Sequence, residues 1–405
     1  MFLAIFCLTL QKYHKKHKQK KHNKMQLPVN TFNDLRTPFY CYDLSLLRLT
    51  LKVIRNEISG FPFIVHYAVK ANANPRILKE IVDMGMGADL VSGNEISAAL
   101  KAGFCPSKMA YAGVGKTDWE IELGLDNDIY CFNVESVPEM EVINDIAALK
   151  GKTAGIAIRV NPNIDAHTHR YITTGTTENK FGIDIPVLDY VIDKAISLPN
   201  IHLRGLHFHI GSQITTMEPF KLLCEKVNQL LDHYEKRGIR FEMIDVGGGL
   251  GIDYNNPEKN NIAPFKDFFN VFKRELKIRE GQKVHFELGR SIVAQCGTLI
   301  SRVVFVKENS IKKFVILDAG MTDLVRPALY GSHHKIVNIS SQDSVIETYD
   351  VVGPICESSD VFSHNEKLPT TKRGDFIAIM SAGAYGESMA STYNMRSLPD
   401  SLFLE

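Results

Sequence analysis

The sequence predicts an α/β domain followed by an all-β domain, namely a TIM (β/α)8 barrel with a C-terminal β-sandwich or β-barrel domain. Three observations predict this arrangement. The chain has 405 residues, more than the roughly 250 that one such barrel needs. Between residues 63 and 288, short runs rich in Val, Ile and aromatic residues alternate with helix-period stretches. After residue 290 the pattern becomes that of strands separated by turns, without long helical stretches.

The expected barrel strands are short, and each is followed by a polar or glycine-containing loop. They lie at residues 63–69, 88–91, 109–114, 129–134, 155–160, 203–210, 241–246 and 283–288. Helical patterns between them lie at residues 75–85, 93–103, 137–151, 186–198 and 219–238. Several of these helices end at a glycine, as helix C-termini often do. Strands that alternate with helices in this way predict a closed parallel barrel.

Four strands are expected in the second domain, at residues 297–308, 312–320, 346–353 and 375–383. The patterns divide the chain into four parts. These are a basic extension at 1–24, a strand segment at 25–44 that joins the β domain, the barrel at 45–288 and the β domain at 289–405.

The basic extension concentrates charge at one end of the chain. Residues 1–24 contain seven Lys and no acidic residue, which leaves 40 basic against 46 acidic residues in the remainder, a net charge of −6. A nucleic-acid-binding protein spreads basic charge over a folded face, so this distribution argues against one. The largely apolar stretch 2–10 has only nine residues, too few to span a bilayer, and the basic run follows it, which argues against export. We expect the extension to be disordered and dispensable.

The seven cysteines are scattered and lack the C-x-x-C spacing of zinc and redox sites. This pattern indicates free thiols in a reducing compartment, so we expect the protein in the cytoplasm.

Reactive side chains follow several of the expected strands, at the barrel end where TIM-barrel enzymes carry their active sites. Lys70 follows the first strand, and burial there is expected to lower its pKa, as Schiff-base lysines require. A single lysine is more often a surface residue, but its neighbours favour the functional interpretation. Residues 247–249 are three glycines whose backbone N–H groups, with the hydroxyl of Ser212, suit a phosphate, although they also suit a plain tight turn.

Glu287 closes the last expected strand. A carboxylate beside a pyridine nitrogen keeps that nitrogen protonated, which makes the ring an electron acceptor. The alternative is an ion pair with Arg290, three residues on. His207 and His209 lie on one face of their strand, where a ring can stack on a flat cofactor or bind a metal. No matching carboxylate or cysteine spacing accompanies them, so we expect no metal.

Two nucleotide-binding patterns fail on single residues. In GGGLGI, Ile252 occupies the place of the last glycine of a dinucleotide-binding loop. In the Walker-like stretch GVGKT at 113–117, Ala110 occupies the place of the first glycine.

Eight motifs together resemble a known family over nearly the whole chain from Thr37. They are HYAVKAN (66–72), GADLVSGNE (87–95), HFHIGSQ (207–213), DVGGGLG (245–251), FELGR (286–290), RPALYG (326–331), CESSD (356–360) and AGAYG (382–386). In this order they resemble the fold-type III pyridoxal-phosphate-dependent decarboxylases, and among these the diaminopimelate decarboxylase family. Leu288 stands where that family usually has proline, which alters the stiffness of the turn and keeps the side chains that act.

The resemblance implies a carboxy-lyase that uses pyridoxal 5'-phosphate to convert meso-2,6-diaminopimelate to L-lysine and CO2, the last step of lysine biosynthesis. It implies that Lys70 holds the cofactor, that His209 stacks on its ring and that Glu287 pairs with the pyridine nitrogen. Further implied cofactor contacts are Ser212, Gly247, Gly248, Gly249, Gly289, Arg290 and Tyr385. The implied substrate contacts are Arg290, Arg326, Tyr330, Glu357 and Tyr385. Cys356 is the implied proton donor, reaching across a homodimer with shared active sites.

Three alternatives share this barrel. An ornithine or arginine decarboxylase needs an acidic residue for a lone distal ammonium, whereas Arg326 and Glu357 suit the zwitterionic distal end of diaminopimelate. A catalytically silent regulatory paralogue is expected to have lost Lys70 or Cys356, and both are present. A racemase exchanges the α-proton without releasing CO2.

The loop at 167–182 is expected to be mobile near the site.

Overall fold

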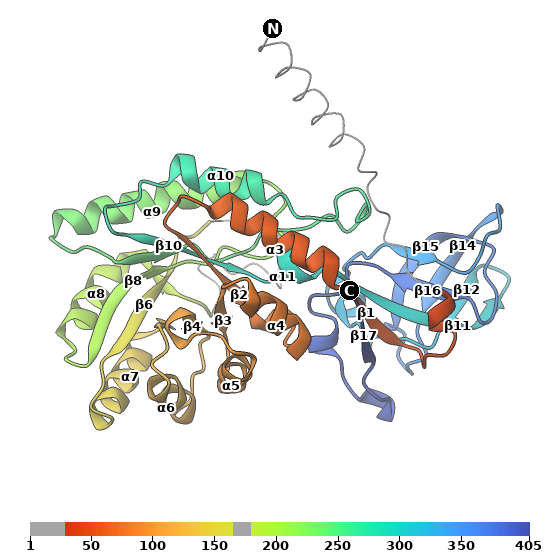
Figure 1. Ribbon diagram of the computed structural model, residues 1–405, viewed down its shortest axis with the longest axis horizontal. Helices are drawn as coiled ribbons and strands as arrows, with labels where there is room; N and C mark the ends of the chain where they lie inside the picture. The colour runs from red at the N-terminus through yellow and green to blue at the C-terminus, as the bar shows by residue number, and fades with distance from the viewer. Residues whose placement is uncertain (1–28, 165–179) are drawn as a thin grey trace, which may run out of the picture.

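The computed structural model describes residues 29–164 and 180–405. The basic extension expected at 1–24 and most of the loop at 167–182 lie outside these residues. Figure 1 shows the barrel and the β domain side by side, with helix α3 (Leu44–Ile58) starting near their junction and running across the barrel.

The barrel consists of parallel strands, and each strand predicted from the sequence corresponds to one of them. They are β2 (Phe63–Ala68), β3 (Gly87–Leu90), β4 (Met109–Tyr111), β5 (Cys131–Val134), β6 (Ala154–Asn161), β8 (Ile201–His207), β9 (Met243–Asp245) and β10 (Lys283–Leu288). The ring closes because β10 pairs with both β2 and β9 while β5 pairs with β6. A two-residue strand, β7 (Ile183–Asp184), extends the sheet beside β6.

Helices cover the outside of this ring. They are α3, α4 (Pro75–Asp83), α5 (Gly93–Ala102), α6 (Asp118–Asp126), α7 (Val137–Leu149), α8 (Leu188–Ser197), α9 (Glu218–Lys236) and α10 (Phe265–Glu275), and the short α11 (Arg290–Val293) follows β10. The sequence signals at α5 show why these helices start and stop where they do. Ser92 accepts a hydrogen bond from the N–H of Glu95 at the start, and Gly103 ends the helix with a φ of 97°.

Single 3-10 turns and short helices connect several elements. They are η1 (Val69–Ala71), η2 (Pro106–Lys108), η3 (Ile185–Val187), η4 (Glu387–Met389), η5 (Tyr393–Met395), α2 (Val29–Phe32) and α12 (Arg326–Tyr330). Among the described residues, no helix is long and apolar enough to cross a membrane.

The second domain is a mostly antiparallel sheet. Its strands are β1 (Phe39–Asp43), β11 (Gly297–Glu308), β12 (Lys313–Leu317), β13 (Ile336–Asn338), β14 (Ile346–Val352), β15 (Val361–Pro369), β16 (Phe376–Ile379) and β17 (Asp400–Leu404). The path runs β13-β16-β11-β12-β14-β15, and β1 pairs with β11 and β17. The sequence patterns did not predict β13, β15 and β17.

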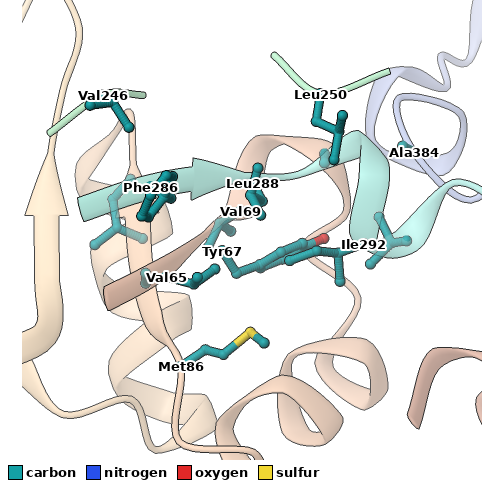
Figure 2. Packing of buried hydrophobic residues seen from close by; sticks show 14 of the residues in the cluster. Val65, Tyr67, Val69, Met86, Val246, Leu250, Phe286, Leu288, Ile292 and Ala384 are labelled. Carbon is teal, nitrogen blue, oxygen red and sulfur yellow. The ribbon is translucent and has the colours of Figure 1, made fainter. Parts of the chain in front are cut away.

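An apolar layer lies between the barrel strands and the helices. The ring of Phe286, on β10, lies 5.0 Å from those of Phe63, Phe269 and Phe272. Figure 2 shows Phe286 and Leu288 on one stretch of β10, near Tyr67 of β2. Because side chains alternate along a strand, Glu287 points to the other side, into the barrel.

The inside of the barrel is polar where such barrels usually hold Val, Ile and Leu. His66 Nε2 lies 2.8 Å from His285 Nδ1. Above them, Glu287 lies 3.2 Å from both Asn133 and His207, and all five side chains are buried. Buried polar groups cost free energy unless they are paired, so this interior indicates a function at the barrel mouth above it.

Candidate active site

A cavity of about 470 Å³ lies at the carboxyl ends of the barrel strands. It brings together ten of the residues predicted for the site, from the barrel and from the β domain. These are Lys70, His209, Ser212, Gly249, Glu287, Gly289, Arg290, Arg326, Tyr330 and Tyr385.

Lys70 lies in η1, directly after β2, and its side chain is 39% exposed, into this cavity. Its Nζ lies 3.4 Å from Asp89 Oδ2 on the neighbouring strand β3. Burial lowers the pKa of Lys70, but the negative charges of Asp89 and Glu287 outweigh that effect and the pKa is raised. The expected lowering of the Lys70 pKa is therefore wrong, because the sequence did not reveal Asp89 as its neighbour.

Glu287 is held as a carboxylate at the floor of the cavity. Its Oε1 accepts a hydrogen bond from Asn133 Nδ2, and its Oε2 lies 3.2 Å from His207 Nε2. Burial raises the pKa of Glu287, but His207 and Lys70 lower it by more than burial raises it. The pKa of Glu287 therefore lies well below its usual value. The alternative of an ion pair with Arg290 is wrong, since Arg290 bonds elsewhere.

Asp245, on β9, lies beside Glu287 and completes a buried group with His207. One ligand atom from each of the three side chains lies within 4.8 Å of the others, a metal-like arrangement within the described residues. The sequence argument considered only local spacing, so it did not reveal these two carboxylates, which come from other strands. Burial and the charge of Glu287 raise the pKa of Asp245 well above its usual value. A protonated Asp245 beside an ionised Glu287 leaves the two carboxyl groups with one shared negative charge.

His209 lies two residues beyond the end of β8, at the cavity wall. Burial, together with the charges of Arg159 and Lys70, lowers the pKa of His209 to about 3, so its ring is neutral at physiological pH. Its Nδ1 accepts a hydrogen bond from the N–H of Gly248 at 3.4 Å. A neutral flat ring fixed in this way suits stacking on a planar cofactor.

The glycine turn packs against the end of β10. A Cβ on Gly248 would lie 1.8 Å from the Glu287 carbonyl oxygen, and Gly249 has a φ of 100°. Side chains are therefore excluded from both positions. Of the predicted glycines 247–249, only Gly249 lines the cavity.

Arg290 and Arg326 form a pair of buried guanidiniums, 6% and 4% exposed. Arg290 donates to Ser212 Oγ at 2.9 Å, and Arg326 donates to Ser332 Oγ at 3.3 Å. Neither pairs with a carboxylate in the described part of the chain. Buried charges without counterions are costly, so the pair indicates an anion-binding wall.

Tyr385 links the β domain to the barrel mouth. Its backbone N–H donates to the carbonyl of Ala71 at 2.8 Å, and its φ is 57°. The Arg290 guanidinium lies 4.9 Å from the centre of its ring. A side chain held in this left-handed conformation beside a cavity is typical of a functional position.

Arg159 and Glu135 form a buried pair beside the cavity. Arg159 Nη1 lies 2.6 Å from Glu135 Oε1, and Glu135 Oε2 accepts from the N–H of Gly182 at 2.8 Å. The Arg159 guanidinium also lies 4.5 Å from the ring centre of Phe181. The pair therefore fixes the chain at 181–182 against the cavity.

Cys356 and Glu357 lie outside the cavity, on an exposed turn of the β domain. The N–H of Cys356 donates to Asn394 Oδ1 at 3.1 Å, and Glu357 accepts from the hydroxyl of Tyr393 at 2.6 Å. A single chain therefore does not bring either residue to Lys70.

The cavity fits a cofactor that carries an aldehyde, a pyridine ring and a phosphate. Lys70 offers an amine, His209 a neutral ring face and Glu287 a carboxylate. Ser291 Oγ and Arg290 Nε are buried and have no hydrogen-bond partner among the described residues, so they offer unused donors.

Comparison with known proteins agrees with this fit. Residues 47–294 match the family model for the pyridoxal-dependent decarboxylases, pyridoxal binding domain. The chain belongs to this class of pyridoxal-dependent decarboxylases.

More specific relatives narrow the class. The chain is 57% identical over 373 residues to diaminopimelate decarboxylase from Bacteroides thetaiotaomicron, covering 92% of this chain and 96% of the relative. The crystal structure of diaminopimelate decarboxylase from Helicobacter pylori complexed with L-lysine superposes with a TM-score of 0.88 at 41% identity, covering 93% and 94% of the two chains. The chain is a member of the diaminopimelate decarboxylase family. Lysine/ornithine decarboxylase from Vibrio vulnificus, at 21% identity and a TM-score of 0.80 over 93% and 97% of the chains, shares the fold.

Proposed function

We propose that this chain catalyses the pyridoxal-phosphate-dependent decarboxylation of meso-2,6-diaminopimelate to L-lysine and CO2. The observation that carries the proposal is the buried pair of Arg290 and Arg326, which faces the Lys70 cavity without a carboxylate partner. Diaminopimelate brings a distal carboxylate to such a wall, whereas ornithine brings none. Membership of the diaminopimelate decarboxylase family supports the same substrate.

The cofactor-holding residues come mostly from the barrel, for which we propose the bounds 45–288, with the β domain at 289–405. When bound, pyridoxal phosphate supplies an aldehyde that captures amines and a ring that accepts electrons. Lys70 would hold the aldehyde carbon, His209 the ring face and Glu287 the pyridine nitrogen. Contacts to the phosphate and ring edge would come from Ser212, Gly247, Gly248, Gly249, Gly289, Arg290 and Tyr385.

Three side chains of this chain manage protons at the site. Glu287, ionised and held by His207, holds a proton on the pyridine nitrogen. The raised pKa of Lys70 means that its amine must lose a proton before it reacts. Asp89 lies 3.4 Å away, and burial, with the charge of Glu287, raises its pKa to about 7. Asp89 is therefore suited to take up the Lys70 proton near neutral pH.

Specificity is expected at the distal end of the substrate. Arg290, Arg326 and Tyr330 bind its carboxylate, and Glu357 of the partner subunit binds its ammonium, with Tyr385 shared between cofactor and substrate. Each charged hydrogen bond is worth about 1.5–3 kcal/mol, and a site left with unpaired charges loses a similar amount. Ornithine and arginine are therefore expected to react poorly.

The protein is proposed to act as a cytoplasmic homodimer. Cys356 and Glu357 are exposed and lie outside their own chain's cavity. They can act only in a dimer in which the turn that carries Cys356 of the partner subunit and Glu357 of the partner subunit enters each site. In that site, Cys356 of the partner subunit would protonate the α-carbon of the substrate after CO2 leaves. The six cysteines in the described part of the chain are all free, which supports a reducing compartment.

The test is CO2 release by the purified full chain with pyridoxal phosphate, supplied in turn with meso-diaminopimelate, ornithine, arginine and lysine. We expect release from diaminopimelate at least about a hundredfold more efficiently than from the others, as loss of two charged contacts predicts. Faster release from ornithine or arginine would identify the rival decarboxylase. Exchange of the α-proton without CO2 would identify a racemase, and no turnover would identify a silent paralogue.

A further inference from the structure

Tyr254 connects the two arginines of the anion-binding wall. It lies in the loop that follows the glycine turn and is only 8% exposed. Its hydroxyl oxygen accepts one hydrogen bond from Arg290 Nη1 and one from Arg326 Nη1, each at 2.8 Å. The two arginines belong to different helices, α11 and α12, while Tyr254 itself lies within the barrel, so its hydroxyl links the barrel to the β domain.

His334 holds the same arrangement from the β domain. Its ring meets that of Tyr254 edge-on at 4.9 Å, its Nε2 accepts from Arg326 Nη1 at 2.9 Å, and its Nδ1 donates to the carbonyl of Met380. Burial and the charge of Arg326 lower the pKa of His334 to about 3, so it stays a neutral acceptor. Both hydrogens of Arg326 Nη1 are thereby assigned.

A neutral bridge has a physical advantage at this place. Two guanidiniums that each lie 2.8 Å from one oxygen are close enough to repel each other strongly in a buried environment. A bridging carboxylate would relieve the repulsion, but it would also cancel the charge that an anionic ligand needs. The phenol oxygen of Tyr254 accepts from both arginines and leaves their charge available.

The cavities show on which side the bridge lies. A second cavity of about 680 Å³ adjoins the Lys70 cavity, and Arg290, Arg326 and Tyr330 line both of them. Tyr254 lines only the second cavity. It therefore approaches the arginines from the side away from Lys70 and leaves their other side to the ligand.

We propose that Tyr254 is a specificity-positioning residue: its hydroxyl sets the spacing of Arg290 and Arg326 so that both bind the single distal carboxylate of the substrate. This inference rests on the proposed function and adds a residue to it. Tyr254 acts through the arginines and has no contact with the reacting carbon.

The test is Tyr254→Phe in the holoenzyme, which removes the bridging oxygen and keeps the ring against His334. We expect KM for meso-diaminopimelate to rise about tenfold or more while kcat stays within about threefold, as loss of binding common to substrate and transition state predicts. Inhibition by L-lysine, which retains the distal amino-acid end, should weaken by a similar factor. Inhibition by cadaverine, which has no carboxylate, should not change.

Two further variants separate positioning from general damage. Tyr349→Phe, in β14, removes a buried hydroxyl that accepts from the N–H of Thr371 at 3.2 Å, and it should leave KM unchanged. His334→Phe removes the other acceptor of Arg326 Nη1 and should also raise KM for meso-diaminopimelate. This variant provides the test if Tyr254→Phe folds poorly.

Several outcomes would overturn the inference. An unchanged KM in an active Tyr254→Phe enzyme would do so, and so would equal weakening of lysine and cadaverine inhibition, which indicates a merely structural role. A wild-type enzyme that releases no CO2 from diaminopimelate would instead refute the proposed function, so the two failures are distinguishable.

Discussion

At the scale of single residues, the site depends on contacts between strands that are distant in sequence. Asp89 is 19 positions from Lys70, and Asn133 is 154 positions from Glu287. The sequence predicted Lys70 and Glu287 because each ends a recognisable strand, and the structure brings both to one cavity. It did not reveal Asp89, Tyr254 or His334, because a residue's own spacing does not show which side chain it meets across the barrel.

The proposed role of Asp89 as a proton acceptor predicts that the activity of the enzyme depends on pH. Burial and the charge of Glu287 raise the pKa of Asp89 to about 7, against the opposing effect of Lys70. Its carboxylate form, which can accept the Lys70 proton, is lost as pH falls through about 7. We therefore expect kcat/KM for diaminopimelate to rise between about pH 6 and 8 with an apparent pKa near 7.

Asp89→Asn should abolish this acidic limb and lower kcat/KM roughly a hundredfold, as loss of a general base does. The measurement is a pH–rate profile of both enzymes. Asp253→Asn is the control, because Asp253 lies in the adjoining cavity and Asn260 holds the pKa of its carboxyl below the usual value. A limb near pH 7 that persists in Asp89→Asn would refute the role of Asp89.

At the scale of elements, strands with strong apolar patterns were predictable and exposed edge strands were not. The bounds of β10 and β11 agree with the predicted runs at 283–288 and 297–308. Strand β15 was missed because it lies at the end of the sheet path and is mostly polar and partly exposed, so it carries no apolar alternation. Edge pairing is a property of the neighbouring strand, which a local pattern does not contain.

Lys116 shows what the Walker-like stretch does in this fold. Its side chain is fully buried, and its Nζ donates to the carbonyls of Gly113 and Asn133 and to Glu139 Oε1 at 2.6 Å. The lysine therefore ties the ends of β4 and β5 to the start of α7, and it binds no nucleotide phosphate in this arrangement.

Lys116→Met should leave Glu139 buried without its partner and lower the free energy of unfolding by roughly 3–5 kcal/mol, as broken buried ion pairs do. Urea denaturation measures this change. Lys79→Met is the matched control, because Lys79 and Asp83 form an exposed pair on α4, 58% and 56% exposed, and its loss should cost less than about 1 kcal/mol. Equal destabilisation by both variants would contradict the proposed tie.

At the scale of the whole molecule, the arrangement of the two domains decides where Cys356 can act. Figure 1 shows the barrel and the β domain as adjacent units, and the turn with Cys356 belongs to the β domain. Because this turn is exposed and outside the Lys70 cavity, one chain holds two incomplete halves of the proposed machinery. A two-fold dimer would complete both sites at once, since each chain gives its turn to the other.

Mixed dimers test this arrangement directly. Lys70→Ala and Cys356→Ala should each be nearly inactive alone, because the first removes the cofactor amine and the second the proton donor. In a heterodimer of the two variants, one site has lost both groups while the other combines an intact Lys70 with an intact Cys356 of the partner subunit. Random reassembly of equal amounts makes half of all dimers mixed, so recovered activity should reach about one quarter of the wild-type value. If each site were complete within one chain, mixing would recover nothing, and the shared-site homodimer would be refuted.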